Sequence, residues 1–570
     1  MSHRSLYKGK KSDIDGGILS NSSSRAQSRS RTPMRSDDSD YESDYEEGEL
    51  LKIEEILREK LSSLNTQDMG EIGKEDRISS GDRRQFEAHQ LSNKRIQENS
   101  NIKDIITSLT FSRSDISSQS RELLLTQLYK LIISKPLVVY NEENIGNKQN
   151  YIDEETVSIL INQFTNSNYR SDLEFLYLFK SVIALICSDI EEFGVLISND
   201  FLGHIQHLIQ EPVNSIITAE NKSNIIIGYT VLTLILYNDS SSFGIDEKIL
   251  LLMEISEGYS ASATTLQKQI ESGDREHATF ITDKNLDKRL INEANSKVLA
   301  EASVATSALN GVGCLITLMK KGEYLNEIME DLMIRLIPLL DNDENRDIAK
   351  AAGKVIAIIY ELYDYGGDDK TEINEEADDD EEYNLNSPYY EQESLNTILT
   401  RLINLSSKKV SKKDKKEISS IFRNILNTIK IYTNTLERDQ IYKRTKEGIE
   451  LSQQIIDTSY IKLSKYKLIK INSWYLYIRL RHIKWLFSFG LHSQLVNNES
   501  VRDVLKEPEN EYSYGSTTNN YDYFDNDDDE EFNQYHHTLN SINDKQRSFK
   551  RKKERTAKMD EQLENLNLKD

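Results

Sequence analysis

Cysteine and proline are scarce in this sequence. Only two cysteines, Cys187 and Cys314, occur in 570 residues, too few for a disulfide framework or a cysteine-based zinc site. Both lie in apolar stretches with helical spacing, so we expect buried core thiols in an intracellular protein. The six prolines, set against an abundance of helix-forming residues, favour an all-α fold.

Long hydrophobic runs are missing as well. The longest apolar stretch, NIIIGYTVLTLILY at 224–237, is shorter than the roughly 20 residues that cross a bilayer and predicts a buried helix. The first residues lack the apolar segment of a secretory signal, so we expect no secretion. We therefore expect a cytoplasmic and/or nuclear protein that has no membrane partner.

The sequence shows none of the common catalytic motifs. Gly311 and Gly313 lack the third glycine of a dinucleotide-binding turn and follow a predicted helix instead of a strand. His204 and His207, three residues apart, are more typical of a helix surface than of a metal site. We find no zinc-protease motif, no phosphate-binding lysine loop and no nucleophile elbow. We expect no enzyme activity, no cofactor, no metal site and no small-molecule substrate.

The chain is polar overall and divides into segments of different composition. Only 37% of residues are apolar and the mean hydropathy is −0.60, so a sizeable part should be disordered. The serine-rich start is a solvated leader or, through Ser28, Ser30 and Thr32, a phosphorylation switch. The predicted segments are a disordered Ser/Arg-rich, then acidic tail (1–48), a helix plus a polar insert (49–100), a helical array (101–363), an acidic linker (364–386), a basic helical domain (387–506) and an acidic, then basic, disordered tail (507–570).

Amphipathic helices alternate in pairs through the helical array. The more apolar helices are centred near 128, 179, 230, 308 and 354, so successive centres lie about 51, 51, 78 and 46 residues apart. The polar stretch 257–290 accounts for the wide interval and leaves roughly 44 residues. A period of roughly 44–51 is typical of HEAT or armadillo repeats, which stack into an α-solenoid. We therefore predict an α-solenoid followed by a small basic helical domain.

Charge is segregated along the chain. The formal net charge is −24, yet residues 408–506 hold 21 Lys and Arg against 9 Asp and Glu, a net of +12. The rest of the chain therefore carries −36. Such segregation is typical of a module that meets nucleic acid while the remainder is repelled from it.

The stretch SKKVSKKDKKEISSIFRNIL, residues 407–426, concentrates this basic charge. Ser411 and Asp414 form a capping-box variant that predicts a helix start. Apolar residues then follow at helical spacing: Ile418, Ile421, Phe422, Ile425 and Ile429. On the other side of the helix, Lys412, Lys416, Arg423 and Lys430 form a cationic stripe about 27 Å long at 1.5 Å per residue.

The cationic stripe predicts an anionic partner. Lysines in a first helical turn oppose the helix dipole, at about 0.3–1 kcal/mol each, and a phosphate backbone would offset that cost through counterion release. We predict binding to the ribosome or other RNA by this helix, through Lys412, Lys413, Lys415, Lys416, Arg423 and Lys430. A nuclear-import signal stays open as an alternative, with Lys408, Lys409, Lys550, Arg551, Lys552 and Lys553 as candidates.

The C-terminal part of the sequence holds SKKD at 411–414, SIFRNIL at 420–426, NSW at 472–474 and FGLH at 489–492. This pattern resembles the interferon-related developmental regulator family, in which a lysine-rich SKKD block leads into an S-x-F-R-x-[VI]-L helix and a later "DSW" helix precedes a glycine-plus-histidine turn. The helix NRDIAKAAGKVIAIIYEL resembles the family's solenoid repeat, although Lys354 replaces an acidic residue. An insert near 430–457 also departs from the family. The matching positions are Ser411–Asp414, Phe422, Arg423, Ser473, Trp474, Gly490–His492, Leu495, Asn498, Arg502 and Asp503.

The resemblance implies a non-enzymatic regulator with a HEAT- or armadillo-like solenoid. Family members are described both as factors that bind translationally idle ribosomes through a basic C-terminal helix and as transcriptional co-regulators that bind corepressor complexes. The charge pattern favours a ribosome- or RNA-associated regulator of translation. A nuclear adaptor, whose solenoid binds corepressor proteins, is the alternative. Trp474 and Trp485 are expected in the core instead of on a base-stacking surface.

Overall fold

The computed structural model describes the central part of the chain. The described residues are 53, 55–57, 101–113, 116–134, 137, 152–166, 168–238, 242–272, 284–342, 344–365, 387–404, 412–435, 437–438, 456, 459–463 and 468–506. The predicted tails, the polar insert and the acidic linker lie almost wholly outside them. Within the predicted first helix, Ile53 is helical and 3% exposed, in contact with the main core.

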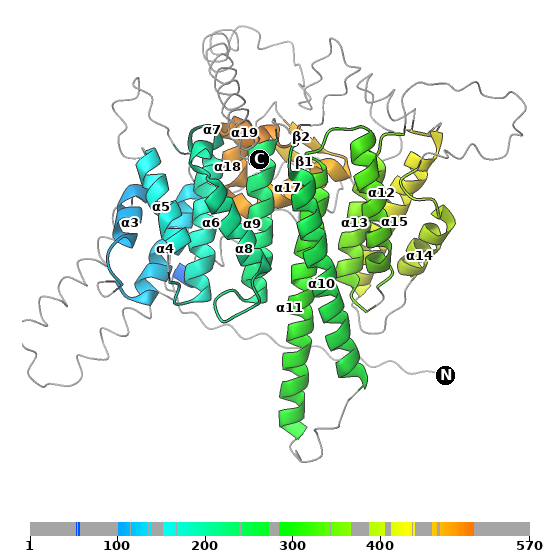
Figure 1. The fold of residues 1–570 in the computed structure, drawn as a ribbon, viewed down its shortest axis with the longest axis horizontal. Coiled ribbons are helices and arrows are strands. Elements are labelled where there is room, and N and C mark those ends of the chain that lie inside the picture. Colours follow the sequence, from blue (N-terminus) through cyan, green and yellow to red (C-terminus); the bar gives the residue numbers. More distant parts are fainter. Residues whose placement is uncertain are drawn as a thin grey trace, which may run out of the picture.

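Six helix pairs stack side by side along the described chain (Figure 1). The second helix of each pair packs on the second helix of the next, so that α4, α6, α9, α11, α13 and α15 form one continuous row. The first helices cover one side of this row. The pairs are α3 (Ile102–Leu109) with α4 (Ser118–Ser134), α5 (Glu154–Asn166) with α6 (Asp172–Ser188), α8 (Asn199–Gln210) with α9 (Ala219–Tyr237), α10 (Ile245–Ser272) with α11 (Lys284–Ile316), α12 (Glu323–Leu340) with α13 (Arg346–Leu362), and α14 (Gln392–Asn404) with α15 (Lys412–Thr433). The predicted α-solenoid is confirmed.

Local sequence signals place several helix starts. The side chains of Ser171, Ser198 and Thr218 accept hydrogen bonds from backbone amides at the starts of α6, α8 and α9, which satisfies donors that have no partner within the helix. Short connections follow α6, with α7 (Ile190–Phe193) and a 3-10 turn η3 (Gly194–Leu196). The middle of the second-helix row is buried on nearly all sides.

The fourth pair differs from the sequence-based expectation. The polar stretch 257–290 is not a plain insert: α10 has 28 residues and α11 has 33, and they extend together as an antiparallel arm beyond the other repeats (Figure 1). The guanidinium of Arg335 in α12 donates two hydrogen bonds of 2.7 Å to the carboxylate of Glu257 in α10. An arm of two helices has only a narrow seam to bury, so its sequence is polar although its backbone is helical.

The segment after α15 returns across the open side of the second-helix row. It begins with an antiparallel hairpin, β1 (Ser459–Lys462) and β2 (Leu468–Ile471), paired from Ser459 with Ile471 to Lys462 with Leu468. The helix α17 (Trp474–Phe487) follows and contacts α6, α9, α11 and α13. The chain then continues through η5 (Ser488–Gly490), α18 (Leu491–Asn497) and α19 (Glu499–Asp503). The hairpin was not expected in a purely helical segment.

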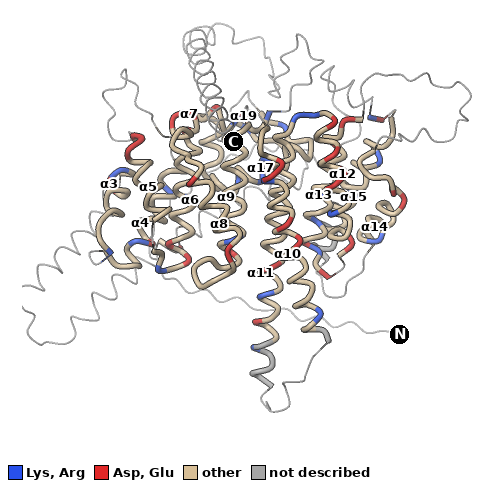
Figure 2. Tube along the Cα trace, in the orientation of Figure 1, with Lys and Arg blue, Asp and Glu red and all other residues tan. Residues whose placement is uncertain are grey.

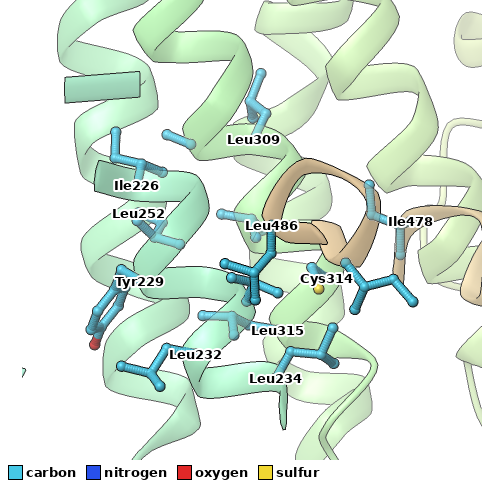
Figure 3. Close-up of a cluster of buried hydrophobic side chains, with 14 of the residues drawn as sticks. Ile226, Tyr229, Leu232, Leu234, Leu252, Leu309, Cys314, Leu315, Ile478 and Leu486 are labelled. Atoms are coloured by element: carbon cyan, nitrogen blue, oxygen red, sulfur yellow. The ribbon is translucent and has the colours of Figure 1, made fainter. Parts of the chain in front are cut away.

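One hydrophobic core includes both the solenoid and α17. Figure 3 shows Ile478 and Leu486 of α17 beside Cys314 and Leu315 of α11 and Leu234 of α9, all of them buried. The packed core therefore continues past the predicted acidic linker and into the basic C-terminal segment. Because α17 occupies the middle of the inner face, that face is not an open channel along the described repeats.

The two cysteines and the apolar helices are interior features. Cys187 and Cys314 are free and fully buried, as predicted, and burial raises the pKa of the Cys314 thiol to about 12. One helical stretch among the described residues, Ile291–Ile316, is long and apolar enough to cross a membrane by length and composition. The apolar window within it is 72% buried against neighbouring helices, as expected for the core helix of a solenoid.

Candidate nucleic-acid interface

The helix that carries the basic block is α15, the last helix of the solenoid row. It begins at Lys412, directly after the predicted capping residue. Phe422, Ile425 and Ile429 are at most 1% exposed, and Ile418 and Ile421 pack against the same core. The predicted apolar stripe is therefore the surface by which α15 packs on the solenoid.

Close packing between α13 and α15 depends on a glycine. A Cβ placed on Gly353 of α13 would lie 2.9 Å from Cδ1 of Ile425 and 3.6 Å from Cε1 of Phe422. The small residue lets the two helices approach, and its neighbours Ala351 and Ala352 are also buried. The orientation of α15 about its axis is fixed by this contact.

The cationic side of α15 faces away from α17. Thr428 points toward α17, because its hydroxyl accepts a 2.8 Å hydrogen bond from the indole nitrogen of Trp474. At about 100° per residue, Arg423 and Lys430 lie about 140° and 160° around the helix from Thr428. Both are exposed. They lie on the side of α15 that no other described helix pair covers, at the open end of the solenoid.

The remaining predicted site residues are only partly placed. Lys412, Lys413, Lys415 and Lys416 belong to the first turns of α15, but their side chains lie outside the described part of the structure. The import-signal candidates Lys408, Lys409, Lys550, Arg551, Lys552 and Lys553 lie outside the described residues altogether. The assignment of these residues to RNA binding or to import therefore stays a prediction.

The motif residues of the C-terminal segment hold that segment on the solenoid. Ser473 caps α17 by accepting from the amide of Leu476 at 3.2 Å, and the Trp474 amide donates to Oε2 of Glu361 in α13 at 2.8 Å. A Cβ on Gly490 would overlap the carbonyl oxygen of Ile133 in α4.

The end of the segment is held in the same way. The side-chain nitrogen Nδ2 of Asn498 donates to the carbonyl of Ser188 at the end of α6, at 2.8 Å, and to that of Cys187, at 3.2 Å. The imidazole of His492 lies 3.0 Å from the carbonyl oxygen of Lys462 in the hairpin. These contacts give the motif positions a structural role.

The two tryptophans have different surroundings. Trp474 is 3% exposed, as the core prediction expected. Trp485 is half-buried: its indole nitrogen donates to Oδ1 of Asn224 in α9 at 3.0 Å, and the ammonium of Lys180 in α6 lies 4.8 Å from its ring centroid. Trp474 is therefore unavailable for stacking a base, and the ammonium of Lys180 already lies over the ring of Trp485.

Arg479 is a buried cation that sequence reasoning did not single out. It is 2% exposed, and its guanidinium donates to the hydroxyl and carbonyl of Thr317, to Oδ1 of Asn238 and to the carbonyl of Val504, at 2.7–3.1 Å. These acceptors lie after α11, at the end of α9 and after α19. Arg479 thus joins three helix ends that are remote in sequence.

Three cations and a tyrosine lie where α17 meets α13, and we call them the groove cluster: Lys350, Lys354, Arg481 and Tyr477. Lys354 is 7% exposed, and its ammonium lies 3.0 Å from the Tyr477 hydroxyl and 4.9 Å from the Tyr477 ring centroid. Burial lowers the pKa of Lys354, the neighbouring Tyr477 opposes this shift, and the charges of Arg481 and Lys350 add to it. The pKa of Tyr477 is also lowered: burial acts against this, but the neighbouring charges of Lys354 and Arg481 favour the phenolate.

His207, Gly311 and Gly313 have structural roles. His207 forms an i, i+4 pair with Glu211 at 3.1 Å, and no group of three or more His, Cys, Asp and Glu is arranged to hold a metal in the described part of the chain. A Cβ on Gly311 would lie 2.8 Å from Leu252 and Thr230, and one on Gly313 would lie 3.1 Å from Ile358. Both glycines serve close helix packing.

Comparison with known proteins identifies one segment of the chain. Residues 284–430 match the family described as "Interferon-related developmental regulator (IFRD)". The matched range runs from the start of α11 to the last turn of α15 and so includes the arm helix, the groove-cluster lysines and the cationic stripe. A search of curated proteins gave no match.

Proposed function

Because the chain belongs, through residues 284–430, to the interferon-related developmental regulator family, we propose that it is a non-enzymatic regulator of gene expression that binds ribosomal or other RNA through α15 and acts on translation. The observation that carries this proposal is the exposure of Arg423 and Lys430 on a helix whose opposite face is fixed to the solenoid.

The position of α15 suits contact with a large polyanion. As the last helix of the row, it presents an outer face that no further repeat covers among the described residues. Its apolar face is buried against Gly353 and its neighbours, so binding needs no rearrangement of the core. A positively charged, preorganised surface gains affinity for RNA because the RNA phosphates release their counterions when the protein neutralises them.

A role in solubility alone explains the charge of this surface less well. The end of a solenoid needs a polar outer face for solubility, and neutral or acidic residues would serve as well in a chain of net charge −24. Four lysines in the first turns of α15 instead oppose its dipole. The sign and density of the charge therefore favour an anionic partner.

Ribosome pelleting across a salt series tests the proposal. Replacing Lys412, Lys416 and Arg423 by Glu should abolish cosedimentation with ribosomes, while the wild-type protein should pellet less as salt rises. A matched control replaces the exposed cations Arg289, Lys297 and Lys320 by Glu and should pellet like the wild type. Unchanged pelleting of the α15 variant at moderate salt would disprove the role of α15.

The alternative is a nuclear adaptor that binds corepressor proteins through the outer layer of the solenoid. Three exposed apolar side chains favour it: Phe243 (69% exposed), Leu250 (45%) and Tyr324 (58%). They gather where α10 and α12 begin, because the Tyr324 hydroxyl donates to Asp246, which is close in sequence to Phe243 and Leu250, at 2.7 Å. Cell fractionation that finds no nuclear pool would exclude this alternative.

A further inference from the structure

The groove cluster brings cations together in a partly dehydrated place. The side chain of Lys354 is buried, and the positive charges of Arg481 and Lys350 act on its ammonium. Asp347 pairs with Lys350 at 2.5 Å but lies on the exposed side, with 62% of its side chain accessible. Like charges in a low dielectric repel one another. An anion bound beside Tyr477 and Arg481 would relieve that repulsion.

Further cations continue from this cluster along α17. Tyr477, Arg481 and Lys484 are spaced i, i+4 and i+7 and so share one side of the helix. Arg481 is exposed, and Lys484 is half-buried. At the other end of α17, Lys180 of α6 lies over the Trp485 ring. The basic side chains thus form a line from α13 to α6, which we call the inner-face strip: Lys180, Lys350, Lys354, Arg481 and Lys484.

The helices behind the inner-face strip contribute polar but uncharged groups. Between Glu301 and its end, α11 has no charged residue, and α9 has only Glu220 and Lys222, both at its start. These helices are accordingly tan over most of their length in Figure 2. Asn224 of α9 accepts a hydrogen bond from the indole nitrogen of Trp485 on this side of the row. A line of cations over a neutral surface suits an extended anion better than a single compact ion.

We propose that the inner-face strip binds the phosphate backbone of single-stranded RNA. A single strand can follow the curved side of the solenoid alongside α17, whereas a duplex is stiff over about 50 nm. Because Tyr477 and Trp485 already hold cations over their rings, they position charge here and do not stack bases. The strip lies on the α17 side of α15, away from Arg423 and Lys430, so this second site goes beyond the proposed function and does not depend on it.

Fluorescence anisotropy with a labelled oligouridylate of about 12 nucleotides, a length within the range that single-strand sites cover, tests the inference on the full chain. The double variant Lys350→Glu, Arg481→Glu should bind at least about tenfold more weakly. Its salt slope should fall by about 1.4, because each lost phosphate contact removes about 0.7.

The matched control is Arg289→Glu with Lys297→Glu, which makes the same charge change at exposed positions of α11 and should bind the oligonucleotide like the wild type. Equal binding by the strip variant and the wild type would overturn the inference and leave the α15 proposal standing. So would displacement of the RNA by a polyglutamate peptide of equal charge as readily as by unlabelled RNA, because the strip would then fit an acidic peptide. If the double variant does not fold, Arg481→Gln alone gives the same readout with the expected direction unchanged.

Discussion

Gly490 packs directly against the carbonyl group of Ile133, and so the turn after α17 touches the end of α4 without any side chain between them. The two residues are remote in sequence but join the turn after α17 to the first repeat. This contact fixes where the C-terminal segment meets the solenoid, and it leads to a stability prediction.

Replacing Gly490 by Ala should destabilise the fold by about 1–3 kcal/mol or more, because the added methyl group overlaps the Ile133 carbonyl and forces α4 and the turn apart. Urea unfolding measures the change. The matched control is Gly203→Ala in α8, where a Cβ meets nothing within 4 Å. That variant should gain about 0.5–1 kcal/mol, because Ala favours a helix over Gly. Similar effects of the two changes would contradict the packing described at Gly490.

Replacing Arg479 by Met should cost about 2–4 kcal/mol, because the carbonyls of Thr317 and Val504 and the amide oxygen of Asn238 would lose their donor in a buried place. The control is Arg481→Met, at an exposed position two residues further along the same helix. Its free energy of unfolding should stay within about 0.5 kcal/mol of the wild-type value. Chemical unfolding of the two variants side by side gives the comparison. Equal stability of the two would show that Arg479 does not join these helix ends.

His482 should make the fold sensitive to pH. Burial lowers the pKa of this imidazole from 6.5 to about 4, and its Nδ1 lies 2.8 Å from the Ile478 carbonyl. Since the unfolded chain binds the proton more readily, stability is fully present above about pH 6.5 and is lost as the pH falls toward 4. That loss amounts to about 3 kcal/mol.

Unfolding midpoints from pH 7 to pH 4 test this contribution. The His482→Gln variant should lose less stability than the wild type over that range, whatever its stability at pH 7. His207→Gln, at an imidazole whose side chain is 69% exposed, should follow the wild-type profile. A His482→Gln profile parallel to that of the wild type would rule out the buried imidazole as the source.

Removing residues 456–570 should expose the inner face of the second-helix row. Ile478, Leu486 and their neighbours cover buried side chains of α9 and α11 (Figure 3), so the shortened chain should bind a hydrophobic dye and aggregate. Removing only 507–570, which is predicted to be a disordered tail, should leave the melting temperature unchanged. A soluble, monomeric chain of residues 1–455 that binds no dye would contradict the shared core.

Sequence patterns were sufficient where a helix has one apolar face. The stripe of Phe422, Ile425 and Ile429 predicted both the helix α15 and the side that packs. The place of α17 was beyond such reasoning, because α17 is buried on most sides and carries no clear stripe that would indicate its neighbours. Buried cations such as Lys354 and Arg479 are missed for a related reason: Lys and Arg are expected at the surface unless a partner is known.

The hairpin had a signal that sequence analysis passed over. In LIKI, residues 468–471, the degree of burial alternates with a period of two. Ile469 and Ile471 are each 1% exposed, whereas Leu468 and Lys470 are only partly buried. The short length of the strands and the helical sequence around them concealed this alternation. The arm formed by α10 and α11 was not predicted, because its exposed helices have few apolar positions.

The hydroxyl of Tyr129 in the first repeat donates to the carbonyl of Leu486, 357 residues later, at 2.8 Å. A ribosome adds about 5–20 residues per second, so the first repeats wait on the order of 20–70 s for the helix that completes their packing. Most solenoids fold repeat by repeat as each neighbour appears. Here the repeats made first are completed only when α17 has emerged, and the nascent chain needs protection from association until then.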